Sequence, residues 1–339
     1  MIDKKTPYFL ALLPILVLIA LLAYNVLLYG DNSLGGANQM ALLFAAATAS
    51  FVGVKYGTSW EAILKGASKS IASTTPAIIV LLLIGSLAGT WLLSGVIPAM
   101  IYYGLQVLNP KIFLFATAII TAIVSLATGS SWSTIATIGI ALLGIGQALG
   151  LPVGLTGGAI ISGAYFGDKM SPLSDTTNLA PAMAGTDLFT HIRYMMYTTI
   201  PSFTITLIIF LVIGFSYTTS EAQDINVLLS AISNSFNVSG WLFLVPILVI
   251  VLIIKKTPAI PALLAGTLLG GLFAVFFQPE VVMSITNSET LNFSSAYMAI
   301  INAMGSDIAI TTDNEMINNL LSTSGMTGML NTIWLIICA

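Results

Sequence analysis

The stretch GDKMSPLSDTTN, residues 167–178, places two carboxyl groups and one ammonium group within eight positions of apolar sequence. Between Lys69 and Asp168 the only charged residue is Lys111. An ionised side chain at bilayer depth costs about 2.5–3.5 kcal/mol, so a cluster of such groups indicates a function. Pro172 lies inside the cluster and interrupts a helix there. The stretch therefore predicts a broken membrane-spanning helix that carries a site for a metal cation or a proton.

The composition is that of a polytopic membrane protein. Of 339 residues, 57% are hydrophobic and only 7% are charged, whereas soluble globular domains contain about 25% charged residues. A net charge of −3 argues against nucleic acid as a partner. Cys338 is the single cysteine, which excludes a disulfide framework and a thiolate metal site. We expect an all-α fold whose first span is retained and is not a cleaved signal peptide.

Apolar runs long enough to span a bilayer as helices recur along the chain. They are residues 8–29, 37–54, 72–94, 112–128, 133–150, 192–216, 240–254 and 257–277, with another that runs from 326 to the end. A further span, between residues 154 and 185, is expected to be broken at Pro172 and again at Pro181. Its first part contains four glycines that we expect to allow close helix packing, namely Gly154, Gly157, Gly158 and Gly163.

Positive charges predict the orientation, because Lys and Arg concentrate in cytoplasmic loops. A cytoplasmic N-terminus places one group of basic residues inside, namely Lys4, Lys5, Lys55, Lys65, Lys69, Arg193, Lys255 and Lys256. Loops 217–239 and 278–325 carry acids but no Lys or Arg, which predicts an outside location. We therefore expect a multi-pass protein of the cell (inner) membrane. Between Lys111 and Arg193, either three crossings or one crossing with a re-entrant hairpin fits.

An internal repeat is visible in outline. LALLPILVLIALL, residues 10–22, resembles LFLVPILVIVLII, residues 242–254, and the two segments are expected to cross in opposite directions. Inverted repeats with broken helices form the architecture of secondary transporters. We divide the chain into residues 1–216, the first repeat with its broken-helix region at about 112–192, and 217–339, a second repeat that stops early. The second repeat contains the external loop 278–325, in which residues 294–304 predict a short amphipathic helix.

Oxygen-bearing side chains gather in two segments, and an oxygen shell is what a hard cation requires. The candidate residues for binding ions and protons are Asp168, Asp175, Thr176, Thr177, Asn178, Ser130, Ser131 and Ser133. The two aspartates are the candidate Na⁺ ligands, and Lys169 is a candidate counter-ion. A carboxylate can hold a proton or a cation but not both, and this competition is the physical basis of exchange. Structural readings are also open, in which Asp168 pairs with Lys169, and Asp175 and Ser133 cap helices.

Three segments resemble the signature of the NhaC-type sodium/proton antiporters, namely residues 162–180, 128–132 and 187–192. The likeness extends from about residue 10 to the end of the chain. It implies a secondary transporter, not an enzyme, that exchanges cytoplasmic sodium for external protons and uses no cofactor. It also implies an alternative, in which malate with protons is exchanged for lactate with sodium. The family continues through a second half that has its own polar segment.

Two other function classes fit the residues less well. An intramembrane aspartyl protease, which Phe166-Gly167-Asp168 suggests, needs a second aspartate on a neighbouring span, yet residues 112–167 contain no charged residue. A passive channel is disfavoured because a tight acidic site slows permeation. The expected partners are sodium ions, protons and the lipid bilayer. A small organic anion, for which Lys169 is the candidate contact, and a second copy of the chain are left open.

Overall fold

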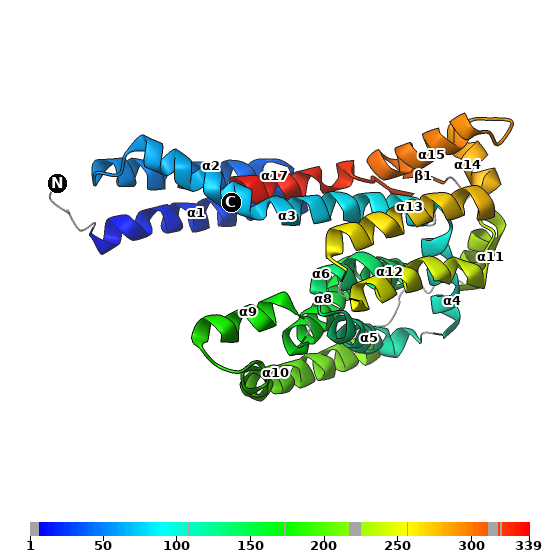
Figure 1. The fold of residues 1–339 in the computed structure, drawn as a ribbon, viewed down its shortest axis with the longest axis horizontal. Coiled ribbons are helices and arrows are strands. Elements are labelled where there is room, and N and C mark those ends of the chain that lie inside the picture. Colours follow the sequence, from blue (N-terminus) through cyan, green and yellow to red (C-terminus); the bar gives the residue numbers. More distant parts are fainter. Residues whose placement is uncertain are drawn as a thin grey trace. The chain divides into compact units, whose positions relative to one another are not determined.

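The computed structural model is an all-α membrane protein, as the composition predicts (Figure 1). It describes residues 7–107, 109–172, 174–216, 225–255, 257–310, 318 and 321–339. Within these residues, seven helices are long and apolar enough to cross a bilayer. An eighth candidate is a bent pair, Asn226–Ser235 with Gly240–Ile254, whose two parts meet at 85°. The prediction of a multi-pass, all-α architecture is confirmed.

The first of two compact units contains residues up to Leu82 together with Thr327–Ala339. Its elements are α1 (Tyr8–Tyr29), the 3₁₀ turn η1 (Gly30–Gly35), α2 (Ala37–Lys55), the first part of α3 (Trp60–Leu93), η5 (Thr327–Met329) and α17 (Leu330–Cys338). The α17 helix lies alongside α2 (Figure 1). The fully buried Gln39 joins them, because its Nε2 donates to the carbonyl oxygens of Leu34 at 2.7 Å and of Asn331 at 3.3 Å.

The second unit, Leu83–Met326, contains the rest of the chain. Its first half comprises α4 (Val96–Val107), η2 (Pro110–Ile112), α5 (Phe113–Thr128), α6 (Ser131–Thr134), the π-helical turn η3 (Ile135–Gly139), α7 (Ile140–Ala148), α8 (Val153–Met170), α9 (Asp175–Ala184) and α10 (Leu188–Ser216). Its second half comprises α11 (Ile225–Ser235), η4 (Gly240–Phe243), α12 (Leu244–Ile254), α13 (Ala259–Phe277), α14 (Pro279–Thr286), α15 (Phe293–Gly305) and the two-residue strands β1 (Ile308–Ala309) and β2 (Ser322–Thr323). The strands pair antiparallel. The predicted boundary at residue 216 lies inside this unit, and the inverted repeat stays a prediction.

Helices α5 and α8 pack more closely than side chains would allow, because α8 presents glycines to α5. A Cβ atom at Gly163 would meet the Ala118 carbonyl oxygen, and one at Gly167 would meet the Ala122 carbonyl oxygen. The Ser125 hydroxyl bridges the helices by donating to the Ala164 carbonyl oxygen at 2.5 Å. The sequence prediction is thus right for Gly163.

Three of the four predicted packing glycines make no such contact. Nothing lies within 4 Å of a Cβ built at Gly154 or Gly157, and at Gly158 the nearest atom is a Phe210 ring carbon at 4.0 Å. A small-residue pattern does not say which face of a helix meets a neighbour, so the predicted Gly154–Gly158 pair was wrong.

The broken span is present, with one difference from the prediction. Helix α8 ends at Met170 and α9 begins at Asp175, so Pro172 lies in the break as expected. Pro181 instead lies inside α9. A proline removes a single helical hydrogen bond, and α9 ends only three residues later, at Ala184, so the helix tolerates it.

The apolar runs underestimate several helical regions, including the start of α3 and the region 278–325. Helix α3 starts at Trp60, whereas the apolar run began at residue 72. The run missed the first turns of the helix because they carry the charged residues Glu61, Lys65 and Lys69. The region 278–325 was predicted to be a loop with one short helix, and that helix is confirmed as α15. It is packed rather than free: Ala299 and Ala303 are fully buried, and the Ser86 hydroxyl donates to the Met304 carbonyl oxygen at 3.0 Å.

Replacing Gly163 by alanine is expected to lower the melting temperature of the detergent-solubilised protein, because the added Cβ would meet the Ala118 carbonyl oxygen and the Thr121 hydroxyl. Overpacking of this kind costs about 1–3 kcal/mol. Gly154→Ala is the matched control, since it makes the same change in the same helix where nothing lies within 4 Å. Equal melting temperatures for the two variants would contradict the close contact between α5 and α8.

Candidate functional site

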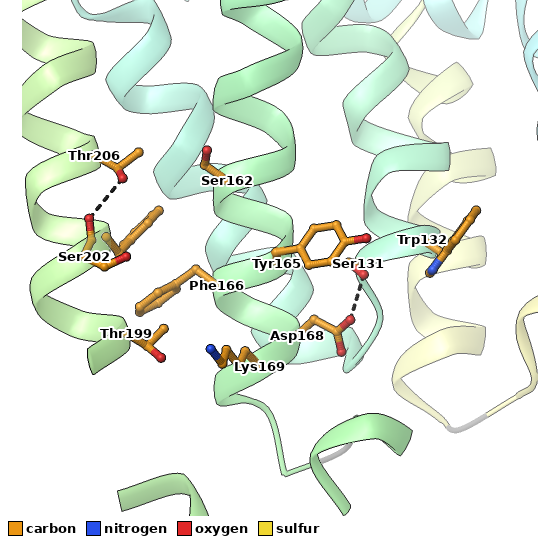
Figure 2. A pocket seen from close by; sticks show the side chains of 11 residues that line it. Ser131, Trp132, Ser162, Tyr165, Phe166, Asp168, Lys169, Thr199, Ser202 and Thr206 are labelled. Atoms are coloured by element: carbon orange, nitrogen blue, oxygen red, sulfur yellow. Dashed lines mark hydrogen bonds between the residues drawn. The ribbon is translucent and has the colours of Figure 1, made fainter. Parts of the chain in front are cut away.

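A hydrogen bond joins the two oxygen-rich segments of the sequence. The Ser131 hydroxyl donates to Oδ2 of Asp168 at 2.7 Å, across a sequence separation of 37 residues (Figure 2). Ser131 is 2% exposed, and Asp168 is half-buried. The geometry thus brings together a carboxyl group and a hydroxyl group that the sequence offered as separate candidates.

The local fold explains how Ser131 reaches this position. Helix α5 ends at Thr128, and Gly129 adopts a left-handed conformation with φ of 70°, which reverses the chain at little steric cost. Ser130 then caps the next helix, because its hydroxyl accepts from the Ser133 amide at 3.2 Å. The predicted cap, Ser133, was therefore three residues too late.

The Asp168 side chain lies beside the amino end of a neighbouring long helix. Elements α6, η3 and α7 form one span, Ser131–Ala148, and Ser131 is its first residue. The amino end of a helix carries partial positive charge, which favours an anionic group nearby. Asp168 itself belongs to the last turn of α8. The site is thus built where one helix ends and another begins.

A π-helical turn follows directly in the same span, at Ile135–Gly139. The Thr134 hydroxyl donates to the Ser130 carbonyl oxygen at 2.9 Å, and the Thr137 hydroxyl donates to the Ser133 carbonyl oxygen at 2.7 Å. π-Turns widen a helix and occur often at functional sites. The first two turns of this helix therefore contain several hydroxyl groups and an irregular backbone.

Side chains from α9 donate hydrogen bonds to backbone carbonyl oxygens around the break after α8. The Thr177 hydroxyl lies 3.3 Å from the Asp168 carbonyl oxygen and 3.2 Å from the Lys169 carbonyl oxygen. The Asn178 amide donates to the carbonyl oxygens of Pro172 at 2.8 Å and Ser174 at 2.7 Å. The Thr177 hydroxyl thus contacts the carboxyl end of α8, and the Asn178 amide holds the segment between α8 and α9.

The cap of α9 is Ser174, whose hydroxyl accepts from the Thr177 amide at 3.4 Å. The sequence prediction placed this cap at Asp175, which is instead the first residue of the helix. Several adjacent residues here can accept a hydrogen bond from a helix end, so the sequence could not choose among them. The side chains of Asp175 and Thr176 lie outside the described part of the structure, and their role as ligands stays a prediction.

Two predicted residues, Ser130 and Ser133, lie near Asp168 in the fold but do not line the pocket beside it. The Ser130 hydroxyl donates to the Ser133 hydroxyl at 3.1 Å, so these two groups pair with each other. Lys169, the predicted counter-ion, points away from the Asp168 carboxylate and toward α10 (Figure 2). Among the described side chains, none pairs with its ammonium group.

A pocket of about 630 Å³ opens beside the Ser131–Asp168 bond. Elements α6, α8 and α10 supply its walls (Figure 2). Its lining residues are Ser131, Trp132, Ser162, Tyr165, Phe166, Asp168, Lys169, Thr199, Ser202, Phe203 and Thr206. Phe166 and Phe203 stack across the α8–α10 contact, with ring centroids 4.1 Å apart.

Sequence reasoning missed the α10 wall, although a signal was present. Thr199, Ser202, Phe203 and Thr206 follow the spacing i, i+3, i+4 and i+7, so they share one helix face. Three of these four residues carry a hydroxyl group. Such a polar stripe on a membrane helix marks a face that does not meet lipid tails.

The donor set of the site consists of oxygen atoms. In the described part of the chain, no group of three or more His, Cys, Asp or Glu residues gathers. The available atoms are the Asp168 carboxylate and several hydroxyl and carbonyl oxygens, a set that suits a hard cation. One carboxylate can also hold one proton, so this arrangement can bind either ion.

The known proteins that this chain resembles are named as antiporters. The family described as "Na+/H+ antiporter family" matches residues 163–339, which is more than half of the chain. The chain is 40% identical over 301 residues to a malate-2H⁺/Na⁺-lactate antiporter of Bacillus subtilis, and 38% identical over 300 residues to the Na⁺/H⁺ antiporter NhaC of Alkalihalophilus pseudofirmus. Each match covers 88% of this chain and 61% of the relative.

A third relative is an uncharacterized Na⁺/H⁺ antiporter of Haemophilus influenzae, 34% identical over 331 residues. That match covers 96% of this chain and 67% of the relative. No solved structure matches the chain at a significant level. The chain therefore spans about three fifths of the first two relatives, which are longer proteins.

Thr177→Val is expected to lower the melting temperature, because it removes the buried hydroxyl that bonds the carbonyl oxygens of Asp168 and Lys169. The loss corresponds to about 1 kcal/mol. Thr186→Val is the matched control, since Thr186 is exposed. If the Thr177→Val protein has the same melting temperature as the control and the parent, this hydroxyl does not stabilise the end of α8.

Proposed function

This chain belongs to the Na⁺/H⁺ antiporter family, and we propose on that premise that Asp168 and Ser131 form the centre at which Na⁺ and H⁺ compete. The observation that carries the proposal is the 2.7 Å hydrogen bond between them. It places an acidic group of the broken helix against a hydroxyl group at the start of another helix. A transporter of this class performs no covalent chemistry, so the site needs only binding and release.

Exchange follows from the fact that one carboxylate cannot hold both ions. When Asp168 is protonated, the site binds no cation. Loss of that proton to water leaves a carboxylate, and Na⁺ then binds between its oxygens and Ser131 Oγ, whose proton turns away from the ion. After the site is exposed on the other side of the membrane, Na⁺ leaves and a proton takes its place.

We propose two backbone carbonyl oxygens as further ligands of the cation. The carbonyl oxygens of Asp168 and Lys169 lie at the carboxyl end of α8, where the Thr177 hydroxyl contacts both. The end of a helix carries partial negative charge, which favours a cation. Asp175, the second predicted ligand, begins α9 across the break. We propose that Asp175 either binds a second proton or coordinates the cation together with Asp168.

Energy for the cycle comes from the proton gradient, with cytoplasmic sodium leaving as external protons enter. If more than one proton enters per sodium ion, each net charge adds about 2.3 kcal/mol per 100 mV of membrane potential. This direction depends on the predicted cytoplasmic N-terminus, which rests on the distribution of Lys and Arg. The protein is proposed to work in the cell (inner) membrane.

Because the chain spans 61% of its first two relatives, the activity, the transported ions and the partners are proposed for the whole protein.

A second candidate function is sodium-coupled exchange of an organic acid, which the name of the Bacillus subtilis relative favours. A homo-oligomer is retained as a proposal from the sequence.

Asp168→Asn is expected to abolish sodium-dependent proton movement, because an amide can neither release the proton nor bind Na⁺ as a carboxylate does. The measurement is the recovery of a fluorescent pH dye in everted membrane vesicles after NaCl is added. Ser131→Ala is expected to raise the half-maximal Na⁺ concentration about tenfold, because the cation loses the Ser131 Oγ ligand beside the carboxylate, a loss of about 1.4 kcal/mol of binding free energy.

Asp187→Asn is the matched control for the aspartate. Asp187 is exposed, and its Oδ2 accepts from the Thr190 amide at 2.9 Å as the cap of α10. Asparagine caps equally well, so transport should persist. Undiminished exchange in the Asp168→Asn vesicles, at the same protein level as the control, would remove Asp168 from the site.

A further inference from the structure

Helix α4 covers one end of the bundle that carries the site, which consists of α5, α8 and the Ser131–Ala148 span. The span begins beside Asp168, and its Gly144 lies 13 positions after Ser131, about 20 Å away at the rise of a helix. Helix α4 packs against the span at this distant point. With 12 residues α4 is too short to cross a bilayer, yet six of its residues are buried.

Helices α4 and α7 are joined by reciprocal contacts between a glycine and an isoleucine. A Cβ atom at Gly144 would lie 2.8 Å from Cδ1 of Ile101, and one at Gly104 would lie 3.1 Å from Cγ1 of Ile145. Both isoleucines are buried, and each occupies the space beside the glycine of the other helix. Helices packed in this way move together, because neither has free volume into which it can slide. Since α7 belongs to the same span as Ser131, a displacement of that span also displaces α4.

A hydrogen-bonded joint connects α4 to the end of α3. Gly95 lies at this joint with a φ of 77°, a conformation that glycine adopts without steric cost. The buried Gln278 side chain lies against the joint, because its Nε2 donates to the carbonyl oxygens of Ser94 at 3.3 Å and of Asn237 at 3.0 Å. Its Oε1 accepts from the Asn237 amide at 2.9 Å. One side chain thus ties the α3–α4 joint to the α11–η4 and α13–α14 turns.

Two buried hydroxyl groups lie in the half of the bundle that α4 covers. Thr117 and Thr156 belong to the first two turns of α5 and α8, whereas Asp168 lies at the end of α8. Both threonines are fully buried, and neither Oγ1 has a hydrogen-bond partner among the described residues. The usual solution is shown by Thr121, whose hydroxyl donates to the Thr117 carbonyl oxygen at 2.8 Å. Unpaired buried hydroxyls are unfavourable, so this conformation excludes water from a place where polar groups would bind it.

We propose that α4 is a gate, which closes the bundle at the end farthest from Asp168 and opens by turning at Gly95. Opening admits water to Thr117 and Thr156 and gives the ions a second route to the site. The inference rests on the proposed function, since exchange at Asp168 requires access from each side of the membrane in turn. The gated side is the outer one, because Asn237 and Gln278 belong to the two loops that the sequence predicts to lie outside.

The test measures how fast a membrane-impermeant maleimide reacts with the Ile101→Cys variant of the full-length protein, in right-side-out vesicles and in a cysteine-free background that includes Cys338→Ser. Ile101 is 1% exposed, so the thiol reacts only when α4 opens. The labelling rate is expected to change about tenfold between sodium-free acidic medium and sodium-rich alkaline medium, since a minor state of up to about 10% becomes dominant when an ion favours it.

Leu114→Cys is the matched control. Leu114 is fully buried, and it shares one face of α5 with Ala118 and Ala122 at the spacing i, i+4 and i+8. That face meets the glycines of α8, so it belongs to the part of the bundle that stays closed. Its labelling should be slow in both media.

A disulfide tests the same contact independently. In the Ile101→Cys/Gly144→Cys double variant, loss of the isoleucine frees the space that the new side chain at position 144 needs. Oxidation of this pair is expected to stop sodium-dependent proton movement, and reduction should restore it. Ile101→Cys alone should exchange ions equally before and after oxidation.

The joint is tested by Gln278→Glu in the Ile101→Cys background. An ionised carboxylate donates no hydrogen bond to the Ser94 and Asn237 carbonyl oxygens, so labelling should become faster even without sodium. Gln106→Glu makes the same change at an exposed position of α4 and should leave the rate unchanged. Equal rates in the two variants would remove Gln278 from the gate.

The outcomes separate the gate from the proposed function. If Ile101→Cys reacts as slowly as Leu114→Cys in every medium, or if the disulfide forms and exchange continues, the gate is overturned and Asp168 keeps its proposed role. In an Asp168→Asn background the Ile101→Cys labelling rate should no longer respond to sodium. A full response there would support the gate and contradict the proposed sodium site.

Discussion

The 2.7 Å hydrogen bond from Ser131 to Asp168 is the interaction on which the site depends. It requires the carboxyl end of α8 and the amino end of the Ser131–Ala148 helix to lie side by side. Backbone groups at helix ends lack hydrogen-bond partners within the helix. Leaving them unpaired is costly in a bilayer, so nearby groups must supply the partners. Here Ser130, Ser174 and Thr177 supply those partners. The same helix ends then provide fields of opposite sign next to one carboxyl group.

Much of the architecture could be predicted from the sequence, because a bilayer demands long apolar runs and tolerates charge only where it is used. The break at Pro172 followed from this constraint, and so did the choice of Asp168 as a candidate ligand. The lengths of helices outside the apolar runs did not, since charged residues such as Lys65 extend a helix without a hydropathy signal. Helices α11 and α14 escaped prediction because they are short.

The site was predicted in pieces rather than as a whole. Ser131 and Asp168 were named separately, and only the fold could show that they touch. The caps were displaced by one to three positions, since neighbouring hydroxyl groups are chemically equivalent until the backbone selects one. Thr199 was missed because a threonine in a membrane helix normally bonds to its own backbone, as Thr198 does, and the spacing that groups it with Ser202 and Thr206 was overlooked. What distinguishes the two is packing, which composition does not encode.

The glycine contact between α5 and α8 constrains how the protein can work. Two backbones that meet without intervening side chains have no room to slide, so these helices behave as one rigid scaffold. Any motion that exposes Asp168 first to one side of the membrane and then to the other must come from the elements around this scaffold. The α10 helix contributes one pocket wall, and the π-turn interrupts the regular hydrogen bonding of the helix that carries Ser131. Under the proposed exchange, alternating access at this centre would therefore require movement of these two walls against a stationary α8.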